Sequence, residues 1–446
     1  MSALVQSVPE GFKKTEAGVI PTDWEVRDLA TLCRSPITYG IVQCGPHVND
    51  GVPYIRVSDM NTRNLDVASM LRTSKEIAAG FKRSKVDEGD IVYALRGKIG
   101  EVRVVDEVTA GANLTQGTAR IAPKPKHSGK YMFWALQSEN SKEQAEGESK
   151  GSTFKEITLG NLQKILLALP NTSTEQTAIA NALSDVDALL IELENLIAKK
   201  QAIKIASMQQ LLTGKTRLPQ FATYTEGAIK GKKKGTKPSE LGEIPEDWGI
   251  SPLSKVLKDN PKYGINAAAV PLQGNLPVYI RITDISEDGY FKPTELVGVN
   301  SPFSNDYQLE TGDIVLARTG ASVGKSYLYN ESDGKLVYAG FLIKVSSNKD
   351  KLKPEYLFQY LKTEQYWSWV TVNSMRSGQP GINGNEYGQL PVPIPSIEEQ
   401  TAIATILSDM DNEIQTLEQR LHKTRQIKQG MMQELLTGRT RLPLLT

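Results

Sequence analysis

The feature that most constrains the fold is a long amphipathic segment that the chain contains twice. The first copy covers residues 172–213, the second covers residues 396–437, and the two align without a gap. In both copies the apolar residues recur at alternating steps of four and three, a 3.5-residue period typical of a coiled-coil seam. The predicted inter-helix seam consists of Ile179, Leu183, Val186, Leu190, Leu193, Ile197, Ile403, Leu407, Met410, Ile414, Leu417 and Leu421.

The length of this segment decides how it packs. A single amphipathic helix usually packs within the core of one domain, but a helix of about 40 residues is ~60 Å long, about twice the diameter of a small domain. Its seam needs a partner along the whole length, and the other copy is the obvious candidate. Both copies begin with the spacing of a capping box, Thr172 with Glu175 and Ser396 with Glu399. Glycines that stop the helix, Gly214 and Gly438, follow both copies.

The rest of the chain is duplicated as well. Matching segments recur at offsets of 223 to 225 residues: GVIPTDWEV with GEIPEDWGI, PYIRVSDM with VYIRITDI, and EGDIVYALRGKIGEV with TGDIVLARTGASVGK. Both helices end in the tail LLTG-K/R-TRLP, at residues 211–219 and 435–443. An internal repeat of this length indicates two tandem copies of one unit. Each unit is a globular part followed by a long helix.

Short apolar runs separated by Gly, Pro, Asn and Asp predict a globular part with a β core and few helices, one of them around residues 131–144. The Gly- and Lys-rich stretch at 226–240 has little to bury and predicts a linker. The predicted domains are a first globular domain at 1–170, a first long helix at 171–214, a linker at 215–240, a second globular domain at 241–395, a second long helix at 396–438 and a tail at 439–446.

Connectivity favours antiparallel pairing of the helices, because each helix then carries the chain from one globular domain to the other. Parallel pairing would require a ~60 Å return through the linker. The predicted fold is therefore of the α+β class. It has two mixed α/β globular domains separated by a long antiparallel two-helix coiled coil, arranged as a pseudo-twofold tandem repeat.

Composition excludes several classes of protein. No run approaches the ~18 apolar residues of a membrane span, and the first residues lack the apolar core of a secretory signal. Two cysteines in 446 residues argue against a disulfide framework, so we expect a cytoplasmic protein. Three histidines without CxxC or HExxH spacing make a structural zinc site improbable. The net charge of +1 decides nothing about nucleic-acid binding, because local surface charge matters more.

The strongest catalytic motif is GASVGKS at 320–326, and it fails as a P-loop. A P-loop needs four residues between its first glycine and the GK pair, and this segment has three. The equivalent segment of the first half lacks the Lys-Ser pair. We interpret the motif as a strand followed by a turn that glycine permits. The chain has no Asn-Pro-Pro-aromatic motif of amino-methyltransferases and no convincing nuclease motif. No catalytic, cofactor-binding or metal-ligating residue is predicted.

The duplicated motifs resemble the specificity subunit of type I restriction-modification systems. The resemblance rests on two variable domains, each with a DW near its start and a GDI segment, a proline-rich strand before P-x-x-x-EQ, and a long helix closing in LLTG-K/R-x-RLP. It covers nearly the whole chain. It implies two target recognition domains that each read one half of a bipartite double-stranded DNA sequence, and helices that set the spacing and dock partner subunits.

The resemblance also assigns the chemistry to partners. Two modification subunits would bind S-adenosylmethionine and methylate adenine, and restriction subunits would use ATP and Mg. This chain would be non-catalytic and would carry no cofactor. The alternatives are a coiled-coil adapter that never reads DNA and an enzyme such as an NTPase. Sequence-selective, partner-dependent DNA binding would distinguish the first function from the others.

Polar and basic residues beside glycine at strand ends are the candidates for DNA contact. Arg and Lys neutralise phosphate or read guanine, and Asn and Gln can pair with adenine. The predicted DNA-binding residues are Tyr39, Arg96, Lys98, Asn113, Gln116, Lys150, Ser152, Tyr263, Arg318, Lys325, Arg376, Gln379 and Asn383. Arg56 and Arg281 occupy matching positions, and we predict that they form structural ion pairs with Asp59 and Asp284. The basic run at 230–237 is interpreted as a solvated linker.

Overall fold

The chain forms two compact units, each built around segments of both long helices. The computed structural model describes residues 8–149, 155–375 and 379–443. The first unit comprises residues 1–194 and 419–446, and the second comprises residues 195–418. Each unit therefore contains one globular part, the beginning of one long helix and the end of the other.

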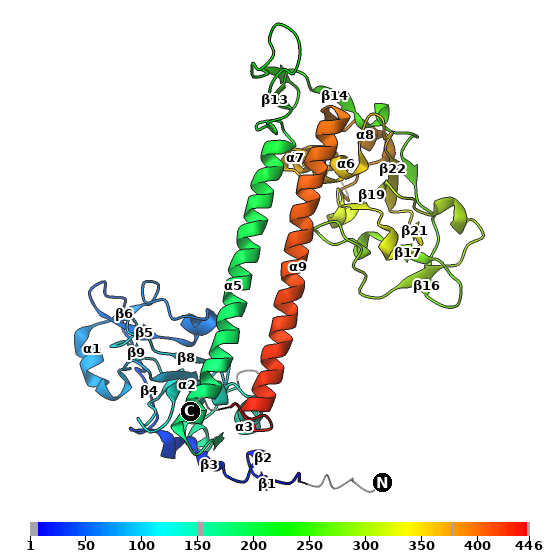
Figure 1. The fold of residues 1–446 in the computed structure, drawn as a ribbon. Coiled ribbons are helices and arrows are strands. Elements are labelled where there is room, and N and C mark those ends of the chain that lie inside the picture. The colour runs from blue at the N-terminus through cyan, green and yellow to red at the C-terminus, as the bar shows by residue number, and fades with distance from the viewer. Residues whose placement is uncertain (1–7, 150–154, 376–378, 444–446) are drawn as a thin grey trace. The chain divides into compact units, whose positions relative to one another are not determined.

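The two long helices are α5 (Ser173–Leu211) and α9 (Ile397–Leu435), and each end lies within three residues of its predicted bound (Figure 1). Their antiparallel pairing is confirmed. In the first unit Lys428 Nζ lies 2.6 Å from Asp187, and in the second unit Lys204 pairs with Asp411. The two ion pairs are one interaction repeated, because each lysine and each aspartate recurs 224 residues later in the chain.

The predicted seam residues are all buried or half-buried. The outer ones also anchor the globular parts. Ile179 and Leu183 lie in one cluster with Trp24, Tyr131 and the end of α9, and Ile403 and Leu407 lie in the equivalent cluster of the second unit. Burial of one such side chain contributes about 1.5–3 kcal/mol, so the long helices are integral to both cores. Among the described residues, no helix is long and apolar enough to cross a membrane.

The first globular part has a four-stranded antiparallel sheet of order β4-β10-β7-β8 and a three-stranded sheet of order β6-β5-β9. Its strands are β1 (Phe12–Thr15), β2 (Gly18–Pro21), β3 (Glu25–Asp28), β4 (Thr38–Tyr39), β5 (Val52–Ile55), β6 (Arg72–Thr73), β7 (Ile91–Ala94), β8 (Val102–Val104), β9 (Asn113–Leu114), β10 (Thr118–Ile121) and β11 (Leu166–Leu169). Its helices are α1 (Lys75–Gly80), α2 (Gly129–Leu136), α3 (Glu139–Gly147) and α4 (Leu159–Gln163).

The second globular part repeats this plan with a sheet of order β15-β22-β19-β20 and another of order β16-β18-β17-β21. Its strands are β12 (Thr236–Ser239), β13 (Gly242–Pro245), β14 (Gly249–Pro252), β15 (Lys262–Tyr263), β16 (Ala269–Pro271), β17 (Val278–Ile280), β18 (Val297–Val299), β19 (Asp313–Ala317), β20 (Ser326–Leu328), β21 (Leu336–Tyr338), β22 (Leu342–Ser346) and β23 (Pro391–Ile394). Its helices are α6 (Pro354–Tyr360), α7 (Glu364–Ser374) and α8 (Gly384–Gly388).

The structure differs from the sequence-based expectation in the helix after β10 and in the predicted linker. The single helix predicted around 131–144 is two helices, α2 and α3, because the Ser138 hydroxyl accepts a hydrogen bond from the Ser141 amide and starts a new helix. The end of the segment predicted as a linker, 215–240, forms β12, which pairs with β13 as β1 pairs with β2. Backbone pairing between the two strands holds this hairpin. The sequence-based prediction relied on apolar residues, which this segment lacks, and it therefore missed the strand.

Two equivalent arginine clusters join three motifs that are far apart in the sequence. In the first unit Arg441, from the tail after α9, contacts Glu175 at the start of α5, with Nε 2.5 Å from the carboxylate, and Asp23 at 3.1 Å. The guanidinium lies 6.0 Å from the ring of Trp24. The DW, EQ and TRLP motifs therefore meet at one place.

The cluster in the second unit is more buried. Arg217 lies 2.6 Å from Glu399 and 2.7 Å from Asp247, and the Trp248 indole donates a hydrogen bond to Glu399 at 3.0 Å. The side chains of Arg217 and Glu399 are only 9% and 2% exposed. Burial disfavours the charged guanidinium, but its hydrogen bonds to Glu399 and Asp247 raise the pKa of Arg217 above its ordinary value. The arginine therefore stays ionised.

These clusters change the predicted capping boxes. Thr172 and Ser396 do cap their helices, accepting hydrogen bonds from the amides of Glu175 and Glu399 at 3.2 Å. The glutamate carboxylates bind the arginines of the tails instead of the cap backbone, because a charged donor is a stronger partner than an amide. The predicted stop at Gly214 is confirmed with φ +70°, and a side chain there would also meet Pro245 Cδ at 2.3 Å.

We predict that Arg217→Ala destabilises the second unit by about 3–5 kcal/mol, because it leaves the buried carboxylate of Glu399 without its cation. Urea unfolding of the full chain measures the loss. The matched control is Lys215→Ala, a substitution of an exposed residue two positions away, and it should lower the free energy of unfolding by no more than about 0.5 kcal/mol. Arg441→Ala should cost less than Arg217→Ala, because Arg441 is 44% exposed. Equal unfolding midpoints for the Arg217 and Lys215 variants would contradict the role of the cluster.

Lys362 is a buried cation without an acceptor. Its Nζ has no hydrogen-bond partner and lies 3.9 Å from the centre of the Phe358 ring, where a cation–π contact replaces part of its hydration. Burial lowers the pKa of Lys362 to about 8, and the nearby carboxylate of Asp411 offsets only part of this effect. The folded state therefore releases this proton more readily than the unfolded chain does.

Lys362→Met should stabilise the second unit by about 1–3 kcal/mol at pH 7, where the lysine is charged in both folded and unfolded states. As pH rises above 8, the folded wild type loses the proton before the unfolded chain does, so the free energy of unfolding of the wild type increases. The difference in this free energy between Lys362→Met and the wild type therefore narrows. Urea midpoints at pH 7.0 and 9.5 measure this change. Lys335→Met, at an exposed position, should show no such convergence. If the urea midpoints of Lys362→Met and the wild type differ by the same amount at both pH values, titration of Lys362 is excluded as the cause.

Candidate nucleic-acid interface

In the first unit, the end of strand β7 and two turns meet at one edge of the central sheet. The Leu95 amide donates to Gly117 O at 2.9 Å, and the Gln116 amide donates to Ile41 O at 3.0 Å. Gly40 is required in this contact, because a side chain there would lie 1.8 Å from Leu114 O. These hydrogen bonds bring together the predicted residues Arg96, Gln116 and Tyr39 at neighbouring positions.

The side chains at this edge differ in exposure. Lys98 and Gln116 are exposed, whereas Tyr39 is half-buried and packs against the core. Arg96 is half-buried, forms no ion pair with a described residue, and has a buried Nε without an acceptor. A buried donor without a partner costs about 1–3 kcal/mol, so the guanidinium of Arg96 is not fully satisfied by the described residues.

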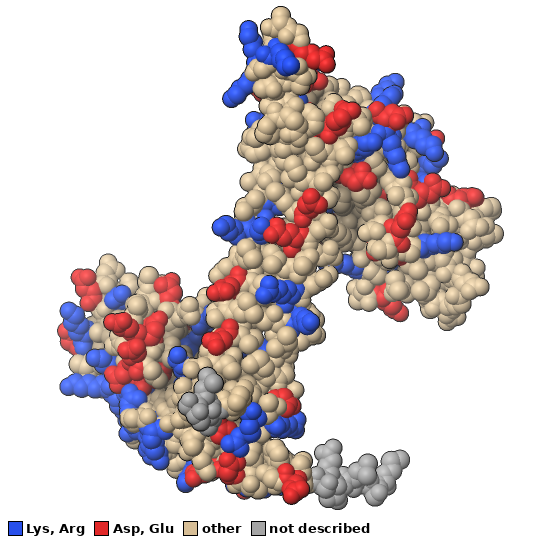
Figure 2. Space-filling model, viewed as in Figure 1, with Lys and Arg blue, Asp and Glu red and all other residues tan. Residues whose placement is uncertain are grey.

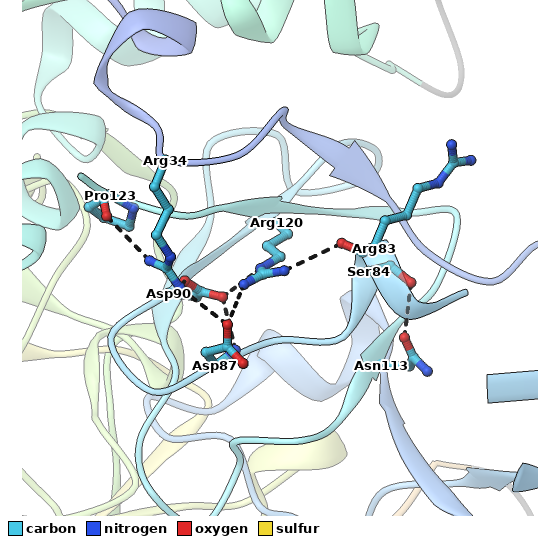
Figure 3. A network of polar contacts seen from close by, with 8 residues as sticks. All are labelled: Arg34, Arg83, Ser84, Asp87, Asp90, Asn113, Arg120 and Pro123. Atoms are coloured by element: carbon cyan, nitrogen blue, oxygen red, sulfur yellow. Dashed lines mark hydrogen bonds and ion pairs between the residues drawn. The ribbon is translucent and has the colours of Figure 1, made fainter. Parts of the chain in front are cut away.

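Asn113 is not available for DNA contact, and this prediction is wrong. Its side chain is 2% exposed and accepts a hydrogen bond from the Ser84 hydroxyl at 2.9 Å (Figure 3). It links strand β9 to the 3₁₀ turn at Lys82–Ser84. An asparagine beside a glycine-containing strand end satisfies the pattern for base contact, but buried polar side chains commonly have this structural role.

The aspartate of the GDI motif is also structural. Asp90 is fully buried and binds Arg34 at 2.7 Å and Arg120 at 2.6 Å, and Arg120 also binds Asp87 (Figure 3). Asp90 also accepts a hydrogen bond from the Asp87 amide at 2.9 Å, which fixes the turn before β7. In the second unit Asp313 binds Lys344 at 3.0 Å and accepts the Glu310 amide. In each unit the aspartate of the motif therefore fixes the start of one inner strand of the four-stranded sheet, β7 or β19.

In the second unit the equivalent edge holds Arg318 and Tyr263 together. The Arg318 guanidinium lies 5.0 Å from the centre of the Tyr263 ring. The Tyr263 hydroxyl accepts a hydrogen bond from the Gly384 amide at 3.0 Å, and the Ile382 amide donates to Arg318 O at 2.9 Å. Like Arg96, Arg318 has a buried Nε without an acceptor and no ion pair with a described residue. Gln379 is exposed close by, against Gly320.

Tyr263 and Arg318 border a concave pocket of about 600 Å³. Its lining includes Tyr263, Arg281, Arg318, Phe341 and the backbones of Gly264 and Gly340, and it contains no carboxylate. Phe341 is 57% exposed at this pocket. A pocket with cationic and aromatic walls suits a ligand that is rich in hydrogen-bond acceptors.

Two further candidates of the second unit are engaged within the protein. The Asn383 side chain caps helix α8, accepting a hydrogen bond from the Glu386 amide at 2.9 Å, so its side-chain oxygen is occupied. Lys325 forms an ion pair with Glu287 at 2.6 Å. The predicted ion pairs Arg56–Asp59 and Arg281–Asp284 are confirmed, both at 2.7 Å. Lys150, Ser152 and Arg376 lie outside the described residues.

One basic segment escaped the sequence-based prediction. The 3₁₀ turn at Lys82–Ser84 lies against β4 and β9, next to Tyr39, and carries the exposed residues Lys82, Arg83 and Lys85. The Arg83 side chain points away from the polar network (Figure 3). The run FKRSK was a visible signal in the sequence. The repeat hid its importance, because the equivalent 3₁₀ turn of the second unit, Ser304–Tyr307, has no basic residue.

Charge on the rest of the surface is mixed. Figure 2 shows basic and acidic side chains interspersed on the face in view, in keeping with the net charge of +1. Most arginines of the two units are neutralised by carboxylates within the protein. Among the described arginines, Arg96 and Arg318 stand out because each has a buried Nε without an acceptor, not because they lie in a basic patch.

Two repeated units with one mixed sheet each, and two antiparallel helices that complete both cores, define a tandem target-recognition protein. The model of the type I restriction modification DNA specificity domain matches residues 21–204 and 234–428. The chain therefore belongs to the family of type I restriction-modification specificity subunits, with two tandem target recognition domains. This membership does not favour the coiled-coil adapter that never reads DNA.

Relatives and solved structures agree with this assignment. A putative type I restriction enzyme MjaX specificity subunit of Methanocaldococcus jannaschii is 25% identical, with 97% of each chain covered. The EcoDI specificity subunit of Escherichia coli is 23% identical, covering 94% of this chain and 88% of the relative. The crystal structure of an S subunit from M. genitalium has the same fold, with a TM-score of 0.56, 16% identity, and 95% and 97% of the two chains covered.

Asn113→Ala should lower the stability of the first unit by about 1–3 kcal/mol and leave the DNA sequence preference unchanged, because the amide bonds within the protein. Urea unfolding and a binding selection on random duplexes measure the two effects. Gln116→Ala, at an exposed position in the following turn, is the control and should leave stability within about 0.5 kcal/mol of the wild type. A changed base preference for a stably folded Asn113→Ala would restore this residue as a DNA contact.

Proposed function

We propose that this chain is the non-catalytic sequence reader of a DNA adenine methyltransferase and restriction complex, each unit reading one half of a bipartite target. The observation that carries the proposal is the recurrence, in both units, of an arginine that forms no ion pair with a described residue at the same edge of the four-stranded sheet. A repeated reader suits duplex DNA, whose two strands are related by local twofold axes.

The proposal assigns the chemistry to partner subunits. Two modification subunits would bind S-adenosylmethionine, and restriction subunits would use ATP and Mg. Exposed apolar residues on the long helices support docking of equivalent partners. Ile203 and Ile427, which are 224 residues apart in the repeat, are 43% and 47% exposed. Apolar side chains in matching exposed positions suit two copies of one partner. Such a complex acts on cellular DNA, so we place the protein in the cytoplasm.

The long helices would also set the spacer between the half-sites. A helix of 39 residues is ~58 Å long, which bounds the reach of such a spacer at about 17 base pairs. Matching changes of whole helical turns in α5 and α9 would then alter the spacer and leave the half-sites unchanged.

A binding selection tests the proposal. The chain is co-expressed with the modification subunits encoded beside it, and the purified complex is incubated with random duplexes and sequenced for bound and methylated targets. We expect a gapped motif of two short half-sites, bound at least about 10³-fold more tightly than unrelated duplexes. The chain without partners and the partners without the chain are the controls. Binding without sequence preference, or a motif without a gap, would exclude two separated readers.

A further inference from the structure

The pocket of the second unit holds one cation that the protein does not neutralise. Arg281, on one wall, forms two hydrogen bonds to Asp284, at 2.9 and 2.7 Å. Arg318 is the other arginine of the lining, and no carboxylate lies among the lining residues. Within the described part of the chain Arg318 has no ion pair, and its Nε is buried without an acceptor. The terminal nitrogens Nη1 and Nη2 of Arg318 form no hydrogen bond with a described residue either, and these nitrogens, not the enclosed Nε, are the donors left for a ligand.

Arg318 is held in place before any ligand binds. Its amide donates to Phe341 O at 3.1 Å, and its carbonyl accepts from the Ile382 amide at 2.9 Å. The guanidinium lies over the Tyr263 ring, and the hydrogen bond from the Gly384 amide fixes the hydroxyl end of that ring. A planar donor with a fixed backbone and a cation–π contact loses little conformational entropy on binding.

The first unit supplies a second, independent case. Arg318 is the first residue after strand β19, and Arg96 is the second residue after the equivalent strand β7. The residue that matches Arg318 is Leu95, whose amide donates to Gly117 O as the Arg318 amide donates to Phe341 O. Arg96 also has a buried Nε without an acceptor. They are the two arginines of the described residues in this state. Their positions differ by one residue, so the two side chains are not equivalent in the repeat, although both lie just after equivalent strands.

We infer that Arg318 reads a guanine of the second half-site through the major groove, and that Arg96 has the same role in the first half-site. This inference rests on the proposed function. A bidentate arginine recognises the O6 and N7 acceptors of guanine, the commonest specific contact between protein and DNA. Contacts to phosphate do not need such a fixed donor, because flexible exposed lysines and arginines supply them. Tyr263 acts as a positioning residue for Arg318.

The test uses the complete complex with its modification subunits. The methylated motif of each variant is read by sequencing, and affinity is measured on duplexes that differ at each base pair of the motif. Arg318→Gln should lose discrimination about ten- to hundredfold at one G·C pair of one half-site. The other half-site should stay unchanged. Arg96→Gln should do the same at one G·C pair of the opposite half-site.

Two further variants test whether the effect comes from loss of charge alone and whether Tyr263 positions Arg318. Lys335→Gln removes one positive charge at an exposed position of the same unit and should leave the motif unchanged. Tyr263→Leu should weaken discrimination at the base pair that Arg318 reads, and at no other position. Urea midpoints and affinity for unrelated DNA show whether each variant is folded.

Three results would overturn the inference. A uniform loss of affinity on all sequences in Arg318→Gln would make this residue a phosphate contact. An unchanged motif in a folded Arg318→Gln complex would show that it makes no base contact. Loss of discrimination at an A·T pair would assign it a different base. In all three cases the wild-type complex still reads a gapped motif, whereas failure of the proposed function would remove that motif from the wild type itself.

Discussion

The structure depends on an arginine from the tail of one long helix meeting a glutamate at the start of the other. Arg217 with Glu399, and Arg441 with Glu175, each bring together a helix start, a helix tail and a DW turn. Helices of this length cannot be positioned by their seam alone, because a seam of period 3.5 tolerates slippage by one heptad. A bidentate ion pair in each unit, which is buried in the second unit, selects one register.

The large-scale plan of the fold could be predicted because it rests on periodicity. Apolar spacing gives the seam, the repeat gives two units, and the order of the segments gives antiparallel pairing; the structure confirms the pairing through the repeated ion pair of Lys428 with Asp187 and Lys204 with Asp411. The arginine clusters could not be predicted in this way. They join residues separated by 418 positions in the first unit and 182 in the second, and a single sequence contains no signal for such a contact.

The candidate site could be predicted only in part, for a related reason. Residue type and the neighbouring glycine select polar side chains at strand ends, but they do not distinguish a side chain that faces solvent from one that faces its own backbone. Asn113 and Asn383 have the same chemistry as true base contacts, and their hydrogen bonds lie within the protein. Arg96 and Arg318 are set apart by unsatisfied donors, a property that only three-dimensional coordinates contain.

The division of the chain between the units has a consequence for its synthesis. The second unit is continuous, residues 195–418, and all of it precedes the last segment of the chain. The first unit needs residues 419–446 to complete its core, since Leu435 and Leu436 lie in the cluster that contains Trp24. On the ribosome the first globular part emerges first yet is completed last. The apolar surface that α9 covers stays open until α9 has been synthesised, so chaperones should bind nascent chains mainly on their first globular part.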